Sequence, residues 1–432
     1  MIKYIHKLFP RGSRVLILGF GREGKSSLRF LKKFVPDIQL GVADANKNVE
    51  VESTPEVHLH LGQHYLDAIA EYDWVIKSPG VKLPEMSKNQ LTKITSQTDL
   101  FLQIYGSQTI GVTGTKGKST TVSLIYHLLK QSGKHALLMG NIGLPAFDFI
   151  EKIKAETLVV YELSAHQLQY VHHAPHVGLL LNLYPQHLDF FGSVETYQMA
   201  KENIFRFQKP DDIAICGPNL QRLPCNPFSE LQQEIKLLFD NHITGKELLQ
   251  LTGLKGDHNL KNILLAAKAV LAVGMKSDKM VAALSNFRPL PHRLEDVGEY
   301  SGIRFVNDSI ATIPQATIAA VKSLEKVDAL ILGGFDRGLD YSELVDFLSK
   351  SAVRYFFFLG KAGKRMLKLF KEKNTPQQFV LVNNLDEIFE QLKYKAEIHS
   401  CLLSPAAASY DQFHNFEHRG DYFKALARKM KE

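Results

Sequence analysis

The stretch GVTGTKGKSTT, from Gly111 to Thr121, has the residue types of a loop that binds phosphate. In such loops glycines expose backbone N–H groups to phosphate oxygens, a lysine bridges those oxygens, and a hydroxyl group reaches a Mg²⁺ ion. Here Gly111 and Gly117 are one residue farther apart than in the usual pattern. A strand-like apolar run precedes the loop and a helical pattern follows it. The predicted nucleotide-binding residues are Gly114, Thr115, Lys116, Gly117, Lys118, Ser119 and Thr120.

A second glycine-rich turn, GFGREGKSS, follows the first strand-like run of the chain. Gly19, Gly21 and Gly24 satisfy the pattern G-x-G-x-x-G, and Asp44 lies at the end of the next strand-like run. Glycines at these places let a phosphate approach the backbone at a helix amino terminus. Taken alone, the turn fits an NAD-dependent dehydrogenase or a purely structural role. A dehydrogenase has no use for a second phosphate loop, so the loop at residues 114–120 argues against NAD.

Three more residues capable of chemistry follow strand-like runs beside the phosphate loop. Glu162 ends one run, His187 follows another, and Lys201 lies in the helical pattern YQMAKENIF. A hard cation prefers carboxylate and water oxygens and tolerates a neutral imidazole. Ser119, Glu162 and His187 therefore predict a Mg²⁺ site, whereas Lys201 taken alone is equally compatible with a solvated lysine. Zinc is not expected, because the remaining histidines of this region have neither cysteine partners nor HExxH spacing: His166, His172, His173 and His176.

The composition is that of an ordinary globular chain. Its 432 residues are 45% hydrophobic and 22% charged. Lys and Arg outnumber Asp and Glu by 52 to 45, but no long basic run is present and there is one Trp, which favours a phosphorylated small substrate over nucleic acid. The amino terminus is too polar for a signal peptide, and no apolar run is long enough to span a membrane. We therefore expect a cytoplasmic protein without nucleic-acid partners or membrane insertion.

The three cysteines carry little information. Cys216, Cys225 and Cys401 match neither a disulfide framework nor a C-x-x-C metal site. In a cytoplasmic protein, thiols are usually kept reduced. We expect three free thiols.

Short apolar runs alternate with helical patterns along the whole chain, which is typical of βαβ units and parallel sheets. The proline-rich segment FRPLPHR interrupts this alternation. We predict an α/β fold of three domains: a Rossmann-like domain at residues 1–97, a central P-loop ATPase-like domain at 98–288 and a Rossmann-like domain at 289–432. Strands are expected at RVLILGFG, LGVADA, DWVIKSPG, TIGVTG, HALLMGN, TLVVYELS, VGLLLNL, IAICG, RFVNDS, ALILGGF, RYFFFLG, QFVLVN and CLLSP.

The loop form T-G-T-x-G-K-S-T resembles that of the Mur ligases and the folylpolyglutamate synthetases, which join an amino acid to a carboxylate at the expense of ATP. Four further segments resemble Mur ligase motifs in the same order along the chain: GDHNLKN, PHRLE, VNDSIAT and LLSPAAASYDQFHNFEHRGDYF. The last of these is the most specific. It resembles the branch that adds glutamate to UDP-N-acetylmuramoyl-L-alanine.

The resemblance implies roles for particular residues. Lys118, His187 and Lys201 would be catalytic, with Lys201 carbamylated and, in that form, a metal ligand beside Ser119, Glu162 and His187. The nucleotide site would also include Asn259, Asn262, Arg293 and Asp308. The UDP-sugar would be held by Gly21, Arg22, Glu23, Asp44, Ser78, Gly80, Asn141, Ser164 and Gln167. Glutamate would be held by Thr312, Arg337, Ser409 and Phe416.

The implied reaction forms an acyl phosphate from ATP and the alanine carboxylate, which the glutamate amine then attacks. ATP and Mg²⁺ are the expected cofactors, UDP-N-acetylmuramoyl-L-alanine and D-glutamate the substrates, and a monomer the expected state. Ile310 stands where many glutamate ligases of this branch have lysine, and Arg337 is the nearest replacement cation. L-glutamate therefore remains an alternative acceptor. More distant alternatives are a folylpolyglutamate synthetase, an NAD-dependent dehydrogenase and an ATP-binding protein without ligase activity.

Overall fold

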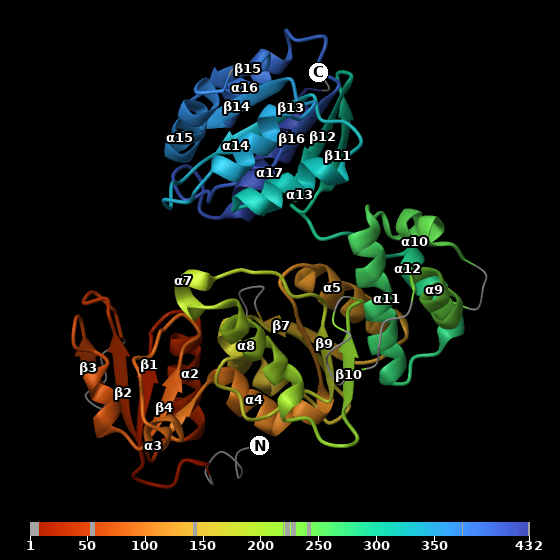
Figure 1. Cartoon of the computed structure of the whole chain (residues 1–432). Helices are drawn as coiled ribbons and strands as arrows, with labels where there is room; N and C mark the ends of the chain where they lie inside the picture. Colours follow the sequence, from red (N-terminus) through yellow and green to blue (C-terminus); the bar gives the residue numbers. More distant parts are fainter. Residues whose placement is uncertain are drawn as a thin grey trace. The chain divides into compact units, whose positions relative to one another are not determined.

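The computed structural model describes residues 8–51, 57–140, 145–218, 220, 225, 230–239, 243–373 and 375–430. The chain divides into two compact units, Met1–Phe287 and Arg288–Glu432. The first unit contains two sheets of five strands and the second unit one sheet of six (Figure 1). The predicted α/β class is confirmed. The domain boundaries at residues 97 and 288 stay a prediction.

The first sheet has the order β3-β2-β1-β4-β5 and is parallel throughout. Its strands are β1 (Arg14–Leu18), β2 (Gln39–Asp44), β3 (Val57–Leu61), β4 (Trp74–Lys77) and β5 (Ile94–Thr95). Helix α2 (Arg22–Phe34) follows the glycine-rich turn directly. A Cβ at Gly24 would lie 2.2 Å from the Gly19 carbonyl oxygen, so only glycine permits this close approach of helix and turn.

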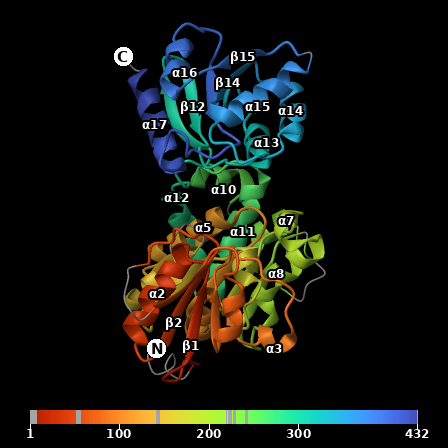
Figure 2. The same cartoon turned by 90° about the vertical axis from the view of Figure 1, so that its left-hand side faces the viewer.

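The second sheet has the order β10-β9-β6-β8-β7 and is also parallel. Its strands are β6 (Thr109–Thr113), β7 (Ala136–Gly140), β8 (Leu158–Glu162), β9 (Val177–Leu180) and β10 (Ile213–Cys216). Neighbouring residues of β8 enter different cores, because successive side chains of a strand point to opposite faces. Val160 packs in the core formed with α5 (Lys118–Gln131) and α11 (Asp257–Ala272), whereas Val159 packs in the core that includes Ile204 of α8 (Val194–Arg206). These three helices are labelled in Figure 2.

The helices of the first unit connect these strands. They are α4 (Gln97–Tyr105), α5 (Lys118–Gln131), α6 (Ala165–Leu168), α7 (Leu188–Phe191), α8 (Val194–Arg206), α11 (Asp257–Ala272), and the more peripheral α3 (Lys88–Leu91), α9 (Leu231–Phe239), α10 (Gly245–Thr252) and α12 (Met280–Ser285). Short 3₁₀ helices are η1 (Asp67–Glu71), η2 (Gly106–Gln108), η3 (Ala146–Lys152) and η4 (Ser277–Lys279). Helix α2 joins the two sheets of this unit, because Ser26 Oγ donates a hydrogen bond to Asp148 of η3 (2.7 Å) and Phe30 stacks on Phe147.

The sheet of the second unit has the order β11-β12-β16-β13-β14-β15, and only the β11–β12 pair is antiparallel. Strand β14 (Tyr355–Leu359) is buried on both faces because its run YFFFL is apolar throughout. Phe357 packs in one core, and Phe356 and Phe358 pack in the other. The strands are β11 (Glu295–Tyr300), β12 (Ile303–Asn307), β13 (Ala329–Gly333), β14 (Tyr355–Leu359), β15 (Gln378–Leu381) and β16 (Ser400–Leu403). The helices are α13 (Pro314–Ser323), α14 (Ser342–Ser349), α15 (Gly360–Lys371), α16 (Leu385–Leu392) and α17 (Phe416–Lys429).

Every strand predicted from the sequence is present, and three strands were missed. β3 carries histidines at alternate positions, β5 spans only Ile94–Thr95, and β11 is an antiparallel edge strand interrupted by a bulge at Gly298. Such strands lack the continuous apolar run of a buried parallel strand. Their place is decided by pairing with a neighbour.

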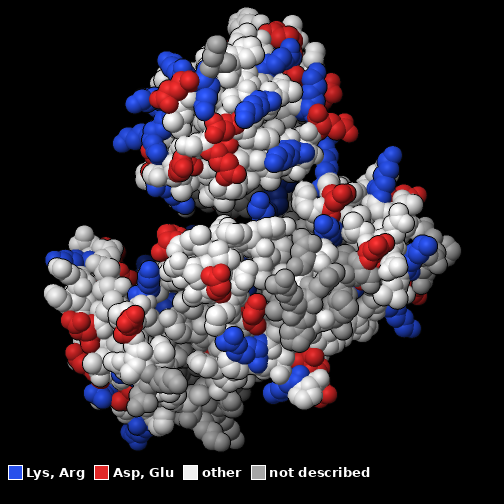
Figure 3. All heavy atoms as spheres, viewed as in Figure 1, with Lys and Arg blue, Asp and Glu red and all other residues white. Residues whose placement is uncertain are grey.

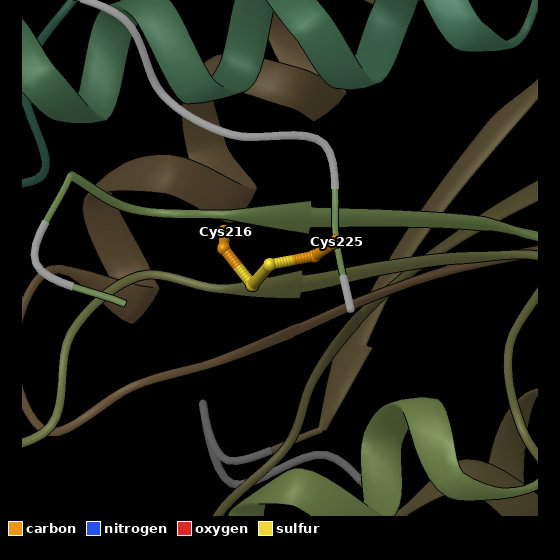
Figure 4. Close-up of a disulfide and its surroundings, with 2 residues drawn as sticks. All are labelled: Cys216 and Cys225. Atoms are coloured by element: carbon orange, nitrogen blue, oxygen red, sulfur yellow. A yellow bond between two sulfur atoms is a disulfide. The ribbon is translucent and has the colours of Figure 1, made fainter. Parts of the chain in front are cut away.

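The prediction of three free thiols is wrong for two of them. Cys216, at the end of β10, forms a disulfide with Cys225, and their Cα atoms lie 5.9 Å apart (Figure 4). Cys216 belongs to a small buried cluster with Leu180 and Leu220, against which Cys225 packs. The spacing of the cysteines in the sequence does not indicate that these two meet. Cys401 of β16 is a buried free thiol, and its burial raises its pKa.

Charges of both signs are dispersed over the face drawn in Figure 3. On the second unit, Lys and Arg side chains alternate there with Asp and Glu side chains (Figure 3). Of the helices formed by the described residues, none has the length and apolarity needed to cross a membrane.

Candidate functional site

The phosphate loop lies between β6 and α5, and its backbone has a conformation that favours glycine. The φ angles of Gly114 and Gly117 are +156° and +87°. Lys118 begins α5, and its Nζ donates hydrogen bonds to the carbonyl oxygens of Gly114 (2.9 Å) and Thr115 (3.2 Å). The ammonium group therefore lies over the loop, at the helix amino terminus where phosphate oxygens bind.

Hydrogen bonds from residues after β9 and from Tyr197 of α8 hold this loop in place. Thr115 Oγ1 accepts a hydrogen bond from Tyr184 N (3.0 Å) and shares another with the Tyr197 hydroxyl (3.1 Å). Lys116 N donates to Asn182 Oδ1 (2.9 Å), and Asn182 Nδ2 donates to Lys116 O (3.0 Å). These contacts hold the loop backbone ready for a ligand, so little ordering is left to occur on binding.

The two asparagines of GDHNLKN lie beside the loop, on the first turns of α11. A Cβ at Gly117 would lie 2.6 Å from Asn262 Oδ1. Asn262 Nδ2 in turn donates to Asn259 Oδ1 (3.1 Å). The structure thus brings the predicted residues Asn259 and Asn262 to the carboxyl side of the phosphate loop.

Lys201 of α8 reaches the same loop from the other side. Its side chain is buried, and Nζ donates to Gly114 O (2.9 Å) and Thr113 Oγ1 (3.3 Å). Glu162, at the end of β8, is also buried and pairs in register with Val112 of β6. Burial holds the pKa of Lys201 well below its usual value, nearby Lys118 lowers it further, and the Glu162 charge opposes both. A lysine so placed is not the solvated side chain that the sequence alone allowed.

His187 stands just before α7 with a φ of +57°, and its ring lies near that of His166, with centroids 5.0 Å apart. Partial burial lowers the pKa of His187; Asp189 opposes the shift, and Lys201 and Lys118 add to it. The imidazole is therefore largely neutral near pH 7, which is the form that binds metals.

The other histidines do not form one cluster. His172 and His173 both contact Asp99, with Nδ1 to carboxylate distances of 3.5 and 2.9 Å, and His176 pairs with Asp212 at 2.9 Å. Each of these histidines thus contacts a carboxylate, which is a structural role.

A Mg²⁺ ion fits this donor set if its coordination is completed by phosphates and water. Among the described residues no group of three or more His, Cys, Asp or Glu side chains could enclose a metal. Mg²⁺ is commonly held by one or two carboxylates together with substrate phosphates. If such an ion binds here, Glu162 would supply the carboxylate, Ser119 in the first turn of α5 a hydroxyl and His187 an imidazole.

The glycine-rich turn, Asp44 and the SPG segment meet at the carboxyl edge of the first sheet, where open parallel sheets bind ligands. Asp44 Oδ2 accepts from Phe20 N (2.6 Å) and Ser78 Oγ donates to Gly19 O (2.6 Å). Gly80 is exposed beside Ser78. Gly21 precedes α2 and Arg22 begins it, both exposed.

Glu23 and Gln167 connect this edge to the central domain. Gln167 Nε2 donates to Glu23 Oε1 (2.8 Å), and Gln167 Oε1 accepts from Ser164 N (3.0 Å). Burial raises the pKa of Glu23 to about 6, and both Gln167 and Lys77 oppose that rise. Asn141, the remaining predicted UDP-sugar residue, lies outside the described residues.

In the second unit, Arg293 and Asp308 lie near the start of the sheet. Asp308 accepts from Ser404 Oγ (2.8 Å) and Leu294 N (3.2 Å). Burial raises its pKa to about 7, opposed by the Ser404 hydrogen bond and by Arg293. Arg293 Nε is buried and has no hydrogen-bond partner among the described residues, so a ligand acceptor would satisfy it.

Three of the four predicted glutamate residues, Thr312, Arg337 and Ser409, lie on loops that follow strands of this sheet. Arg337 is exposed, with its guanidinium 5.5 Å from the centroid of the Tyr410 ring. Ser409 precedes Tyr410 and is buried, and Phe416 begins α17. Thr312 is partly exposed and lies just before α13. The loops of Arg337 and Ser409 are joined by the bridge between Phe335 and Ala408.

Sequence reasoning missed residues that the structure adds to these sites. His166 lies against His187, Tyr410 lies under Arg337, and Lys77 is buried beside Ser78. Lys77 was visible in the sequence as a charge ending an otherwise apolar strand, WVIK, which is a usable signal. His166 and Tyr410 carried no such signal, because their neighbours come from distant segments.

Comparisons with known proteins identify the family of the chain. The Mur ligase MurD-like N-terminal domain matches residues 13–97, and the Mur ligase middle domain matches residues 112–221. A UDP-N-acetylmuramoylalanine--D-glutamate ligase of Clostridium botulinum is 32% identical over 459 residues, with 98% of each chain covered. The protein of the same name from Desulfitobacterium hafniense is 34% identical over 446 residues, with 96% of this chain and 97% of the relative covered.

The fold is shared with solved Mur ligases. UDP-N-acetylmuramate-alanine ligase of Thermotoga maritima aligns with a TM-score of 0.56 at 16% identity, covering 96% of this chain and 99% of that one. A Mycobacterium tuberculosis folylpolyglutamate synthase aligns with a TM-score of 0.55 at 13% identity, over 78% of this chain. The glutamate ligases thus share 32% and 34% sequence identity with this chain over nearly its full length, whereas these solved structures share its fold at 16% and 13% identity. The chain belongs to the Mur ligase family.

Proposed function

We propose that this enzyme joins D-glutamate to the alanine carboxylate of UDP-N-acetylmuramoyl-L-alanine, using ATP, as a step in peptidoglycan precursor synthesis. The observation that carries the proposal is the meeting of Lys118, Lys201 and Glu162 at one loop: the Nζ atoms of both lysines donate to Gly114 O at 2.9 Å. Its full-length likeness to glutamate ligases supports the choice of substrates.

The chain's residues have distinct tasks in this reaction. A carboxylate is a poor acyl donor, so the alanine carboxylate attacks the γ-phosphate of ATP and becomes an acyl phosphate. Lys118 moves from its loop carbonyls onto the phosphate oxygens and stabilises the charge on the transferring group. The glutamate amine then attacks the acyl carbon as the free base, and phosphate leaves.

The metal site contributes charge neutralisation. When bound, Mg²⁺ held by Ser119, Glu162 and His187 would offset the negative charge of the phosphates. Lys201 would supply a carbamate there, since a lysine of low pKa offers the neutral amine that reacts with CO₂. Asn259 and Asn262, which lie beside the loop, would contribute to the nucleotide site of the first unit. The nucleotide-binding roles of Arg293 and Asp308 stay a prediction from the resemblance.

Phosphate release tests the whole proposal. We expect it to require ATP, UDP-N-acetylmuramoyl-L-alanine and D-glutamate together, with L-glutamate giving little turnover. Pure enantiomers assayed separately decide the stereochemistry. Turnover with L-glutamate alone would overturn the acceptor but leave the ligase reaction. Release that depended on a folate, or hydride transfer to NAD, would overturn the reaction itself.

Replacing Arg337 by alanine is expected to raise the KM for glutamate by about 10- to 100-fold, because a charge-assisted hydrogen bond to a substrate carboxylate is lost. The KM for ATP should change little. Steady-state kinetics with each substrate varied in turn measures both values. Lys350→Ala, an exposed cation of the same unit, serves as the control. Equal effects on both KM values would place Arg337 outside the glutamate site.

A further inference from the structure

Lys77 and Glu23 of the first unit carry opposite charges and do not form an ion pair with each other. Lys77 ends β4, and only 2% of it is exposed. Its Nζ donates to the carbonyl oxygens of Ser78 (3.2 Å) and Pro79 (3.3 Å) and lies 5.1 Å from the centroid of the Tyr170 ring. No carboxylate among the described residues is within ion-pair distance of it. The lysine therefore has only long bonds to neutral oxygens of its own strand end.

Glu23 carries the opposite charge, and only one of its two carboxylate oxygens accepts a hydrogen bond from the described residues. Although the residue as a whole is partly exposed, Oε2 is buried and has no hydrogen-bond partner among the described residues. Oε1 accepts from Gln167 Nε2 at 2.8 Å. Gln167 is fully engaged, because its Oε1 accepts from both N and Oγ of Ser164 (3.0 and 3.1 Å). The free acceptor at this place is Glu23 Oε2, and Gln167 orients it.

The two charges affect each other electrostatically. Burial lowers the pKa of Lys77 to about 8, and the Glu23 charge opposes that shift. The Lys77 charge in turn opposes the rise in the pKa of Glu23 that burial causes. Buried charges are costly unless they are paired or hydrogen-bonded. A ligand group that contacts both side chains must accept from the ammonium and donate to the carboxylate.

The position of the pair indicates which molecule supplies that group. Glu23 lies in the first turn of α2, directly after the glycine-rich turn, and Lys77 precedes Ser78, whose Oγ donates to Gly19 O. Both therefore adjoin the edge where the UDP-sugar is proposed to bind. A secondary amide has the required chemistry, since its N–H donates and its C=O accepts.

We propose that Glu23 and Lys77 together hold a secondary amide of the UDP-sugar substrate, with its N–H donating to Glu23 Oε2 and its C=O accepting from Lys77 Nζ. This rests on the proposed function, whose substrate carries two such amides: the acetamido group of the sugar and the bond between the lactyl group and alanine. Glu23 and Lys77 would bind the amide-bearing part of the substrate, and the glycine-rich turn would bind its diphosphate.

Binding measured by calorimetry without ATP tests this pair with three ligands: UDP, UDP-N-acetylglucosamine and UDP-N-acetylmuramoyl-L-alanine. Glu23→Gln places an N–H group either against the ligand amide or against Gln167. Lys77→Met removes the ammonium while keeping the chain length. Each variant should bind the amide-bearing substrate about 10- to 100-fold more weakly, with UDP affinity unchanged. Glu151→Gln, an exposed carboxylate paired with Lys33, is the matched control.

The ligands also identify which amide is held. Weaker binding of UDP-N-acetylglucosamine together with the full substrate indicates the acetamido group, and weaker binding of the full substrate alone indicates the alanyl amide. Unchanged affinity of both variants for the full substrate is the result expected if water, rather than the substrate, bonds to Glu23 and Lys77, and it overturns the inference. An equal loss of affinity for UDP also overturns it. Thermal melting shows whether either variant fails to fold, in which case the other decides. If the unsubstituted enzyme does not bind the full substrate, the proposed function itself fails.

Discussion

The Lys118→Ala enzyme is expected to release phosphate on the order of 1,000-fold more slowly than the unsubstituted enzyme, or not measurably. Preorganised positive groups at a transferring phosphoryl group contribute effects of this size. Lys118 Nζ lies over the loop, where it donates hydrogen bonds to Gly114 O and Thr115 O. Phosphate release under saturating substrates measures the loss.

The matched control for this experiment is Lys130→Ala, an exposed lysine in the last turn of the same helix. Its turnover should equal that of the unsubstituted enzyme. The fold should survive in both variants, because Lys118 is only partly buried, and thermal melting checks this. A loss of only a few-fold in Lys118→Ala would mean that this loop does not bind the reacting phosphates.

The second large effect is expected at Lys201. Lys201→Ala should retain about 1% of turnover or less, because it removes the group that would become a carbamate beside Glu162. Added acetate or formate should restore part of the activity, since a small carboxylate can enter the space left by the side chain. Arg206→Ala, an exposed cation on the last turn of α8, is the control and should be unaffected.

A readout independent of turnover accompanies the Lys201 experiment. With ¹³C-labelled bicarbonate, the unsubstituted enzyme should show a carbamate carbon resonance by NMR that Lys201→Ala lacks. The buried position of the amine and its lowered pKa favour that modification. Unsubstituted-like turnover of Lys201→Ala would remove Lys201 from the mechanism. Loss of activity without a carbamate signal would leave the lysine important as an ammonium group.

Much of the fold was predictable because the local residue patterns in the sequence indicate the same parallel sheets that the structure contains. Continuous apolar runs such as LVVY in β8 and YFFFL in β14 require burial on both faces, which in a βαβ chain means a parallel sheet. Residues at the carboxyl ends of such strands share one edge. Glu162 could therefore be placed near the phosphate loop from the sequence, and the structure puts it there. Strands without this pattern, such as β11, were not recognised.

The pairing of side chains across the fold was decided only by tertiary structure. By itself, the sequence determined the phosphate loop, the parallel sheets and the order of motifs, because glycine conformations and hydrophobic runs are properties of neighbouring residues. It could not show that Cys225 returns to Cys216, that Gln167 holds Glu23, or that Lys201 is buried against Gly114. Those contacts join residues that are not neighbours along the chain, and only the packed fold brings them within bonding distance.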